Sequence, residues 1–214
     1  MRICLRVSGE LLSSLGVIVL GFLAYMYWGT ALRATAAQQV FTRELSSQWS
    51  GASELAALAS PSELAAGTPF ALLRVPQLGR SWQFAVVQGT GQAQLAVAPG
   101  HLPGTALPGQ VGNFVVAGHR VTAGGPFWRL PSLHPGSMVI VITINARYEY
   151  EVTSRPRWVS ADDTAVTAPV PGHPGEHARL RMMTLISCDS PWTGARRVVV
   201  TGILVRVLPR QQGG

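Results

Sequence analysis

The chain has 214 residues, of which 47% are apolar, so it can hold one domain with a sizeable core and an additional segment. Its 17 basic residues, all arginine, and its 10 acidic residues give a net charge of +7, and charged residues make up only 13% of the chain. Because the arginines are scattered and form no run or stripe, this charge does not indicate nucleic-acid binding. We therefore expect no nucleic-acid partner.

Residues 11–28 form an uncharged apolar segment that is long enough to cross a bilayer as a helix. Aromatic residues gather at its far end, as in an interfacial belt, and Arg2 and Arg6 precede it. We expect a transmembrane anchor, with residues 1–10 as a cytoplasmic tail and the rest outside the cytoplasm. A cleaved signal peptide is the alternative, because residues 34–36 (ATA) resemble a small-residue cleavage site. Both interpretations place the following domain outside the cytoplasm.

Residues 29–69 are rich in Ala, Ser, Gln and Thr, and Pro and Gly interrupt them near their end. We expect a stalk or linker with no chemistry of its own, in which residues 39–49 favour a helix. The two cysteines, Cys4 and Cys188, lie on opposite sides of the predicted membrane span, so no disulfide framework is expected.

Short apolar and β-branched runs recur between Gly and Pro turns from about residue 70 onward. This pattern predicts an all-β domain over residues 70–214, an antiparallel sandwich or barrel rather than alternating β–α units. One helical turn is expected over residues 126–130, and the long last run is expected to be central in the sheet. The predicted strands are 72–75, 84–87, 114–117, 138–144, 148–152, 180–186 and 198–207.

Residues with reactive or charged side chains lie at the ends of three of these runs. His119 follows the run NFVVAG, Cys188 ends TLISC, and Arg196 and Arg197 open the last strand. A cysteine near an imidazole gains thiolate character and can attack a carbonyl, and a guanidinium can stabilise the resulting oxyanion. Each residue also has a structural alternative: a buried thiol, a structural histidine or a solvated edge charge. Composition alone leaves both interpretations open.

Several segments together resemble the sortases, the membrane-anchored cysteine transpeptidases of Gram-positive bacteria: ALPGQVGNFVVAGHR, PFWRL, TLISC and RRVVVTG. The resemblance covers about residues 72–207, and residues 98–120 are especially similar to the class E sortases of actinobacteria. It implies an eight-stranded β-barrel with short helices, and a His–Cys–Arg site that cuts a C-terminal sorting signal of LPxTG or LAxTG type. It implies no metal ion and no other cofactor.

The resemblance assigns roles to three residues. His119 matches the catalytic histidine, Cys188 the nucleophile, and Arg197, which directly precedes the apolar strand, the arginine. Arg196 should face the other way by strand alternation. The implied reaction forms a thioester between Thr of the sorting signal and Cys188, and an amine of a cell-wall precursor or a pilin then resolves it.

The implied partners are surface proteins that bear a sorting signal, an amine of the peptidoglycan precursor, and the cytoplasmic membrane. The implied location is a single-pass anchor with a cytoplasmic N-terminus and an extracellular catalytic domain. A housekeeping role in anchoring is favoured over pilus polymerisation, because no pilin-class loop signature is present. The acceptor amine is left open.

The sequence departs from the class E pattern at two positions. Ser187 replaces the usual threonine before the cysteine but keeps a hydroxyl. Ala123 stands where class E members have a tyrosine that is linked to choosing Ala in the signal, so the LAxTG preference is left open. We expect Ala123, Thr184, Ser187 and Trp192 to line the substrate groove. Asp189 would disfavour the thiolate if it pointed inward, so we expect it to point outward.

The remaining candidates have structural interpretations. His101 is expected to order its Gly/Pro loop, and Asp162 and Asp163 to cap a helix or form a turn. His173, Glu176 and His177 lie in a loop that offers no rigid face for a metal ion.

Two alternatives to a transpeptidase stay open. One is a catalytically weak, wall-associated module that binds sorting-signal peptides or pilins without turnover. The other is a thiol hydrolase, in which water outcompetes the amine.

Overall fold

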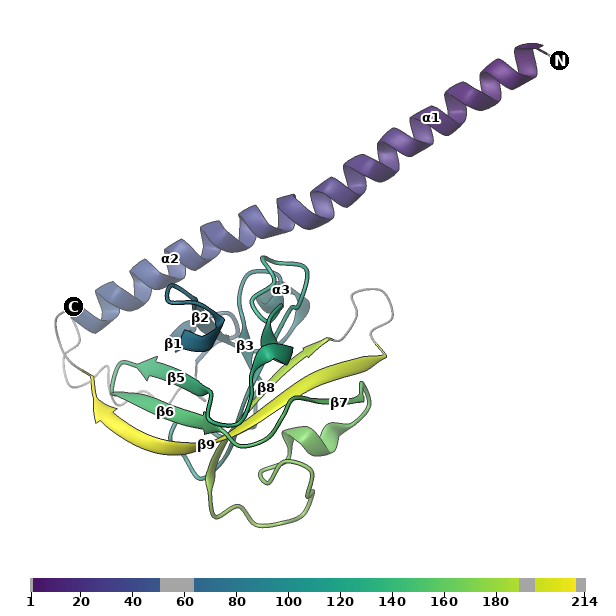
Figure 1. The fold of residues 1–214 in the computed structure, drawn as a ribbon. Helices are drawn as coiled ribbons and strands as arrows, with labels where there is room; N and C mark the ends of the chain where they lie inside the picture. Colours follow the sequence, from purple (N-terminus) through teal and green to yellow (C-terminus); the bar gives the residue numbers. More distant parts are fainter. Residues whose placement is uncertain (1, 51–63, 189–194, 211–214) are drawn as a thin grey trace.

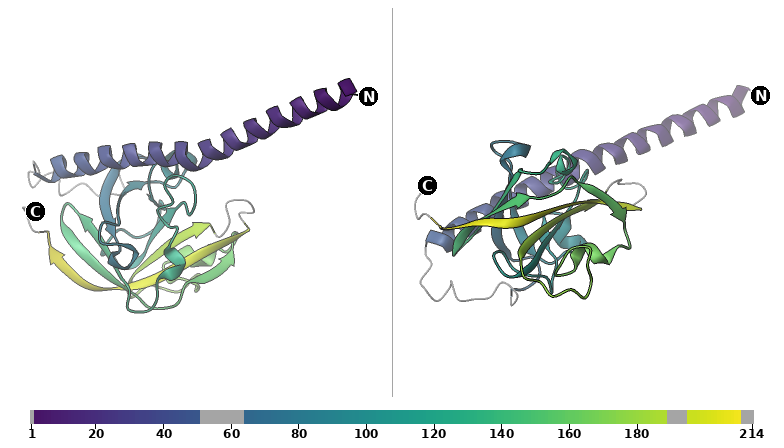
Figure 2. Two further views of the ribbon diagram at one scale, coloured as in Figure 1. Left: turned by 45° about the horizontal axis from the view of Figure 1, so that its top comes forward. Right: turned by 60° about the horizontal axis from the view of Figure 1, so that its bottom comes forward.

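The computed structural model describes residues 2–50, 64–188 and 195–210. It consists of a β-barrel and one long helix that lies along the barrel and projects well beyond it (Figure 1). Figure 2 shows from two further sides that the first part of this helix leaves the barrel and the second part runs over it. The helix comprises α1 (Arg2–Ala24), the π-helical turn η1 (Tyr25–Gly29) and α2 (Thr30–Ser50).

The first part of the long helix carries the predicted apolar segment. Residues 6–24 are apolar and long enough to cross a membrane, and none of this stretch is buried inside the protein. The predicted N-terminal apolar helix is thus confirmed, and it fits a single-pass anchor. The helix does not end with the apolar segment at residue 28, because α2 continues directly from η1.

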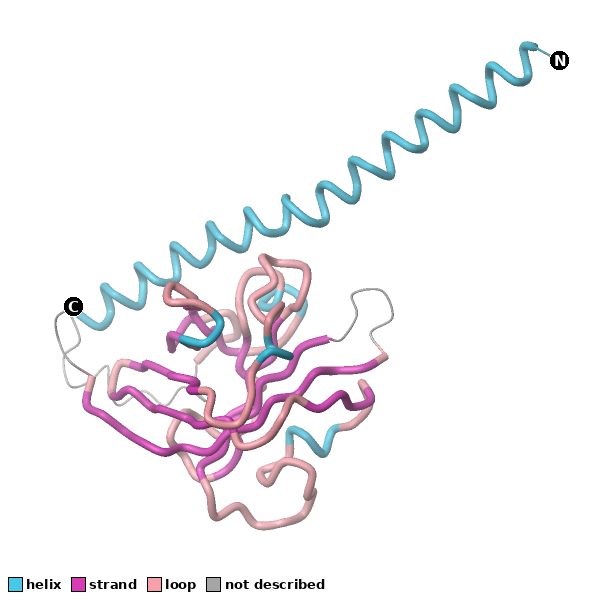
Figure 3. The backbone as a smooth tube through the Cα atoms, viewed as in Figure 1, coloured by secondary structure: helices cyan, strands magenta, loops and turns pink. Residues whose placement is uncertain are grey.

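The described residues after the long helix form nine strands joined by connections that contain short helices (Figure 3). The strands are β1 (Pro69–Arg74), β2 (Gln83–Gln88), β3 (Gly100–His101), β4 (Gly112–Gly118), β5 (Met138–Thr143), β6 (Ala146–Val152), β7 (Arg157–Ser160), β8 (Arg181–Cys188) and β9 (Arg196–Pro209). The short helices are η4 (Pro76–Leu78), α3 (Gln92–Leu95), η5 (Leu130–Ser132) and η6 (Thr164–Thr167).

Eight of the strands close into a barrel in the order β6-β5-β1-β2-β3-β4-β8-β9, because β9 also pairs with β6. β7 pairs with β9 outside this ring. The predicted eight-stranded barrel is therefore confirmed. Two pairings, β2–β3 and β4–β8, are parallel rather than antiparallel, which the sequence analysis did not expect.

All seven predicted strands are present, and the long β9 is central, since it pairs with β6, β7 and β8. β3 and β7 were not predicted. The helical turn expected over residues 126–130 is a pair of successive turns, in which Trp128 N–H donates to Gly125 O at 2.9 Å and Leu130 N–H to Phe127 O at 3.1 Å. These turns lead into η5.

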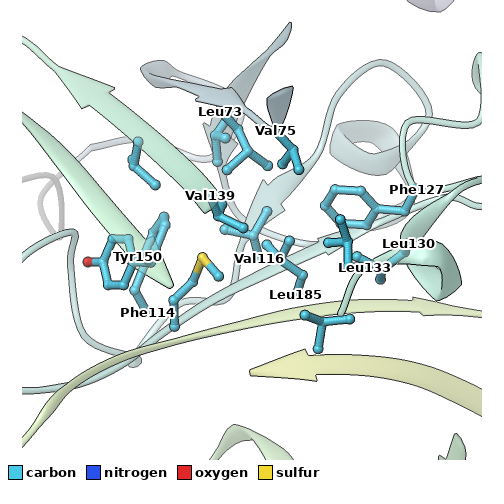
Figure 4. Packing of buried hydrophobic residues seen from close by; sticks show 14 of the residues in the cluster. Leu73, Val75, Phe114, Val116, Phe127, Leu130, Leu133, Val139, Tyr150 and Leu185 are labelled. Atoms are coloured by element: carbon cyan, nitrogen blue, oxygen red, sulfur yellow. The ribbon is translucent and has the colours of Figure 1, made fainter. Parts of the chain in front are cut away.

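Alternate residues of the strands fill the barrel with a central core. Phe127, Leu130 and Leu133, from the segment after β4, gather at one end of this core, and Phe114 and Tyr150 lie at the other (Figure 4). The hydroxyl of Tyr150 is satisfied because it accepts a hydrogen bond from Gly109 N–H at 2.8 Å. Each large apolar side chain that is fully buried here stabilises the fold by about 1.5–3 kcal/mol.

Two smaller apolar clusters cover the outside of the barrel. The η6 cluster lies over β4, β8 and β9 and consists of Val115, Val166, Ile186 and Val199. The α2 cluster lies over β1 and β2 and consists of Leu45, Leu72 and Ala85, with Phe41, Trp49 and Ile142 packed against it. The segment predicted as a linker thus contains a helix that is docked on the barrel.

Candidate active site at the end of strands β4, β8 and β9

Three strand ends meet at one edge of the barrel, and they carry the residues singled out in the sequence. β4 and β8 run parallel with Gly118 opposite Ser187, and His119 follows Gly118 directly. β8 and β9 run antiparallel, with Cys188 and Arg197 as Cα partners. The topology therefore brings His119, Cys188 and Arg197 to the same edge.

The alternation along β9 separates the two adjacent arginines. Val198 and Val200 belong to the central core, whereas Val199 belongs to the η6 cluster on the outside. Arg197 shares the alternate positions of Val199 and is half-buried, while Arg196 is exposed. The Nε–H of Arg197 donates to Ala161 O at 3.2 Å, which fixes the base of the guanidinium beside β7.

His119 is partly buried at the start of a tight loop. Its carbonyl accepts a hydrogen bond from Phe127 N–H at 3.0 Å, so the loop over residues 119–127 closes on itself. Burial lowers the pKa of His119, because an imidazolium loses solvation there. The neutral imidazole is therefore the favoured form at this position.

The residue before His119 must be small. A Cβ on Gly118 would lie 2.8 Å from the ring of Phe127. The glycine lets this ring pack directly against the end of β4, and the ring in turn supports the loop that begins with His119.

Three of the four residues predicted to line the substrate groove are buried. Ser187 is 2% exposed and its hydroxyl donates to Gly118 O at 2.9 Å, which ties β8 to β4 beside the site. Thr184 is fully buried and donates to Asn113 Oδ1 at 2.7 Å. Ala123 is 5% exposed. Of the three, only Ser187 makes its hydrogen bond directly beside His119 and Cys188. Trp192, like Asp189, lies outside the described residues.

Asn113 is a supporting residue that the sequence analysis missed. It is buried and accepts from Thr184, and its amide donates to Val166 O at 3.2 Å and Ala168 O at 3.0 Å. It thereby joins β4, β8 and the η6 segment at the end of β4 that lies away from His119. An asparagine within the apolar run NFVV was the signal in the sequence, because a polar residue in a buried strand needs internal partners.

A hollow of about 370 Å³ opens beside the loop that follows His119. Part of its wall comes from β2 and part from the loop, and Arg120 stacks over the Trp128 ring at 5.7 Å. Its lining residues are Trp82, Phe84, Arg120, Val121, Gly124, Gly125, Pro126, Trp128 and Arg129.

Two of the structural interpretations are confirmed. His101 is buried, its Nδ1 lies 2.8 Å from Gln88 Oε1, and its Nε2 lies 3.0 Å from Thr105 Oγ1, so it orders the loop around it. Asp163 caps η6 by accepting from Ala165 N–H at 3.1 Å.

Comparisons with known proteins agree with this architecture. The family model for the sortase domain matches residues 73–205. The chain is 31% identical to Sortase SrtE1 of Streptomyces coelicolor in an alignment of 213 residues that covers 97% of this chain and 59% of that protein. The chain therefore spans about three fifths of the length of this curated relative.

Solved sortases share the barrel. Sortase E from Streptomyces avermitilis is 35% identical with a TM-score of 0.63, over 68% of this chain and 93% of that one. Sortase E1 from Streptomyces coelicolor, solved with a tripeptide in its active site, is 32% identical with a TM-score of 0.60, over 67% of this chain and 92% of that one. With a matching domain over most of its length and a closed eight-stranded barrel, the chain belongs to the sortase family of cysteine transpeptidases.

Proposed function

We propose that this protein is a transpeptidase that cleaves a sorting signal of LPxTG or LAxTG type between Thr and Gly and transfers the acyl group to an amine. The observation that carries the proposal is the strand register. Cys188 and Arg197 are Cα partners, and the parallel pairing of β4 with β8 brings His119 to the same edge. Family membership supplies the reaction class.

The proposed reaction starts with the Cys188 thiolate, which attacks the carbonyl carbon of Thr and forms a C–S bond. Arg197 stabilises the oxyanion that develops, because a guanidinium presents several donors in a fixed geometry. The C–N bond to Gly then breaks, and His119 as imidazolium protonates the leaving amine. In the second half, neutral His119 takes a proton from the incoming amine, the amine attacks the thioester, and the thiolate is restored.

The protonation states restrict this reaction to a minority of molecules. The attacking sulfur must be a thiolate while His119 is an imidazolium. Burial lowers the pKa of His119, so its charged form is scarce at neutral pH. Activity should peak between the two apparent pKa values, which belong to the coupled pair.

The supporting residues receive narrower roles than the sequence suggested. Thr184 and Ser187 hold β8 in place against β4 through buried hydrogen bonds. Ala123 has only a methyl group where class E sortases have a tyrosine. We therefore propose that this position does not select the second residue of the sorting signal. The rates with LPxTG and LAxTG peptides, measured as described below, decide which signal the protein prefers.

The proposed setting is the outer face of the cytoplasmic membrane, where residues 6–24 of α1 would serve as the single span. The proposed partners are surface proteins bearing a sorting signal and an amine of the peptidoglycan precursor. Attachment of such proteins to the cell wall is the resulting cellular role.

The test uses the full chain in detergent with LPxTG and LAxTG peptides, with and without a glycine-based amine. We expect a thioester on Cys188, detectable by mass spectrometry, and a ligated peptide when the amine is present. Free acid in the presence of the amine would identify a hydrolase, and a peptide that binds without any thioester would identify a binding module.

The matched control replaces the nucleophile alone. Cys188→Ala should abolish the thioester and the product, whereas Cys4→Ala, which removes the other cysteine of the chain, should retain activity. Full activity of Cys188→Ala would remove the proposed mechanism.

A further inference from the structure

Helix α2 faces the barrel with one row of side chains. Ala34 and Leu45 are buried, and Phe41 and Trp49 pack into the α2 cluster. Together with Gln38, these residues recur at intervals of four, three, four and four, which places them on a single helix face. The docked face therefore extends along nearly the whole helix.

Gln38 attaches the middle of this face to the edge of β2. Its Oε1 accepts from Ala85 N–H at 2.6 Å, and its Nε2 donates to Ala85 O at 3.3 Å and to Val97 O at 3.2 Å. β3 pairs with β2 only at Val87 and Gln88, so the side-chain amide takes the place of a strand partner at Ala85. This arrangement fixes the register of α2 on the barrel.

The first turns of α2 rest on the loop that follows His119. Thr30 Oγ1 lies 3.4 Å from Ala123 N, which donates to it. An ideal Cβ added to Gly124 would lie 3.9 Å from the Cβ of Ala34, so the helix passes close enough to the loop that a side chain at position 124 would touch it. Figure 1 shows the helix passing over this side of the barrel.

This loop is tightly wound. Ala123, Gly124 and Gly125 have φ values of 54°, 75° and 56°, and Ala123 is the one non-glycine residue with positive φ in the described part of the chain. A left-handed alanine costs about 1–2 kcal/mol, so the surrounding contacts must hold it in place. Thr30 supplies such a contact from outside, with Ala34 facing Gly124 one turn further along the helix, and Phe127 closes the loop on the carbonyl of His119 from inside.

We propose that α2 is a positioning element of the active site: Thr30 and Ala34 seat the loop that carries His119, and Gln38 locks the helix in the register that allows it. For catalysis, this inference rests on the proposed transpeptidase function. Because α2 continues from α1 through η1, the segment that leads to the membrane also sets the position of the imidazole. Residues 30–50 then belong to the catalytic unit rather than to a passive stalk.

The first experiment tests the contact itself and needs no substrate. The 3.9 Å between the two Cβ positions fits a disulfide, whose Cβ atoms lie about 3.5–4.5 Å apart. A cysteine at position 124 must keep the φ of 75°, which costs about 1–2 kcal/mol, less than the roughly 2–4 kcal/mol that a disulfide typically contributes. The full chain with Ala34→Cys and Gly124→Cys, and with Cys4→Ser and Cys188→Ser to remove its own thiols, should form this disulfide under mild oxidation in membranes. The control pair Ala36→Cys and Gly124→Cys should not, because Ala36 lies on the exposed face of α2. Absence of the disulfide, or equal cross-linking of both pairs, would overturn the inference.

The second experiment tests the positioning role. Ala34→Leu inserts a larger side chain between helix and loop, and displacement of a catalytic group by about 1 Å costs about 100-fold in rate. We expect kcat to fall by about 10- to 100-fold with little change in the KM for the peptide, and Ala36→Leu to stay within about twofold of the parent chain. Gln38→Leu with its neighbour Gln39→Leu, which is exposed, gives a second matched pair with the same expectation.

A readout on Cys188 separates positioning from loss of folding and from failure of the proposed reaction. Alkylation of Cys188 against pH reports its thiolate, which depends on the nearby imidazole, and needs no sorting signal. The profile should shift in Ala34→Leu and Gln38→Leu and stay unchanged in Ala36→Leu and Gln39→Leu, with all four variants showing a cooperative thermal transition. If Ala34→Leu and Gln38→Leu keep the parent profile and kcat while folded, α2 does not position the site.

Discussion

Arg196 and Arg197 are neighbours with the same side chain, and their environments differ because a strand turns alternate residues to opposite faces. Arg197 is half-buried and pairs with Cys188 across strands β8 and β9. Its Nε–H donates a hydrogen bond to the Ala161 carbonyl. Arg196 is exposed beside it. The pair therefore forms an internal control for the role of a guanidinium at this edge.

Replacing the two arginines separately should give unequal effects. Arg197→Gln should reduce kcat/KM for transpeptidation by about 100- to 1,000-fold, the usual cost of one oxyanion donor, while Arg196→Gln should stay within about twofold. Stopped-flow measurement of thioester formation on Cys188 would locate the loss in the first step. Equal losses in both variants would show that net charge, rather than one guanidinium, matters.

Thr184 is a buried polar residue that we expect to contribute to the stability of the fold rather than to substrate binding. Thr184→Val keeps the shape but leaves Asn113 Oδ1 without its 2.7 Å partner, and an unsatisfied buried acceptor costs about 1–3 kcal/mol. We expect the free energy of unfolding, measured by urea denaturation, to fall by this amount. Thr184→Ser retains the hydroxyl and should recover most of the loss; a serine variant as unstable as the valine variant would point to packing instead.

At the scale of elements, the end of β4 and the loop after it depend on the close approach of Gly118 and Phe127. Gly118→Ala would place a Cβ 2.8 Å from the ring, and such overpacking costs about 1–3 kcal/mol. Because the ring supports the loop that begins at His119, kcat should fall as well. Gly91→Ala is the control, since its Cβ would meet only the flexible end of Gln94 within 3 Å. Both unfolding free energy and kcat should change in the first variant and neither in the second.

The elements that the sequence predicted are those with a continuous apolar pattern. β4 and β8 carry short apolar runs and β9 a long β-branched one, and each strand was expected near its observed position. β3 has only two residues, and β7 has mostly exposed residues, so neither leaves an apolar run in the sequence. The parallel pairing of β4 with β8 was not predictable either, because strand partners depend on barrel closure rather than on local pattern.

The sequence contains only a weak indication that α2 packs on the barrel, and the overall composition of the segment obscures it. The segment is dominated by small and polar residues, which suggested a linker, yet its apolar residues Ala34, Phe41, Leu45 and Trp49 share one face with Gln38. Few apolar residues suffice here because Gln38 and Arg210 add hydrogen bonds, the latter from its guanidinium to Trp49 O at 2.8 Å. Their partners lie far away in the chain, so the sequence alone could not identify them.

For the whole molecule, closure of the barrel explains why catalytic residues so distant in sequence can meet. His119 and Cys188 were predicted by resemblance, and their shared edge follows from the ring of strands, in which β4 and β8 are neighbours. The same closure leaves polar groups such as His101 inside the protein. The protonation of His101 is therefore coupled to folding, because the imidazole is buried only in the folded protein.

The stability of the whole protein should therefore depend on pH through its buried imidazoles. Burial lowers the pKa of His101 below its ordinary 6.5, and the hydrogen bonds at Ala106 and Thr105 only partly oppose this effect. The unfolded chain binds more protons than the folded one in this range, so the stabilisation is fully present above pH 6.5 and is lost as the pH falls through the lower folded pKa.

We expect the melting temperature, followed by circular dichroism, to fall as the pH is lowered through this window, and to fall less steeply in His101→Gln. That variant should be less stable at neutral pH, because it loses packing against Phe70 and Phe114, so the slope rather than the absolute value carries the test. An identical slope in His101→Gln would mean that this imidazole does not couple folding to protonation.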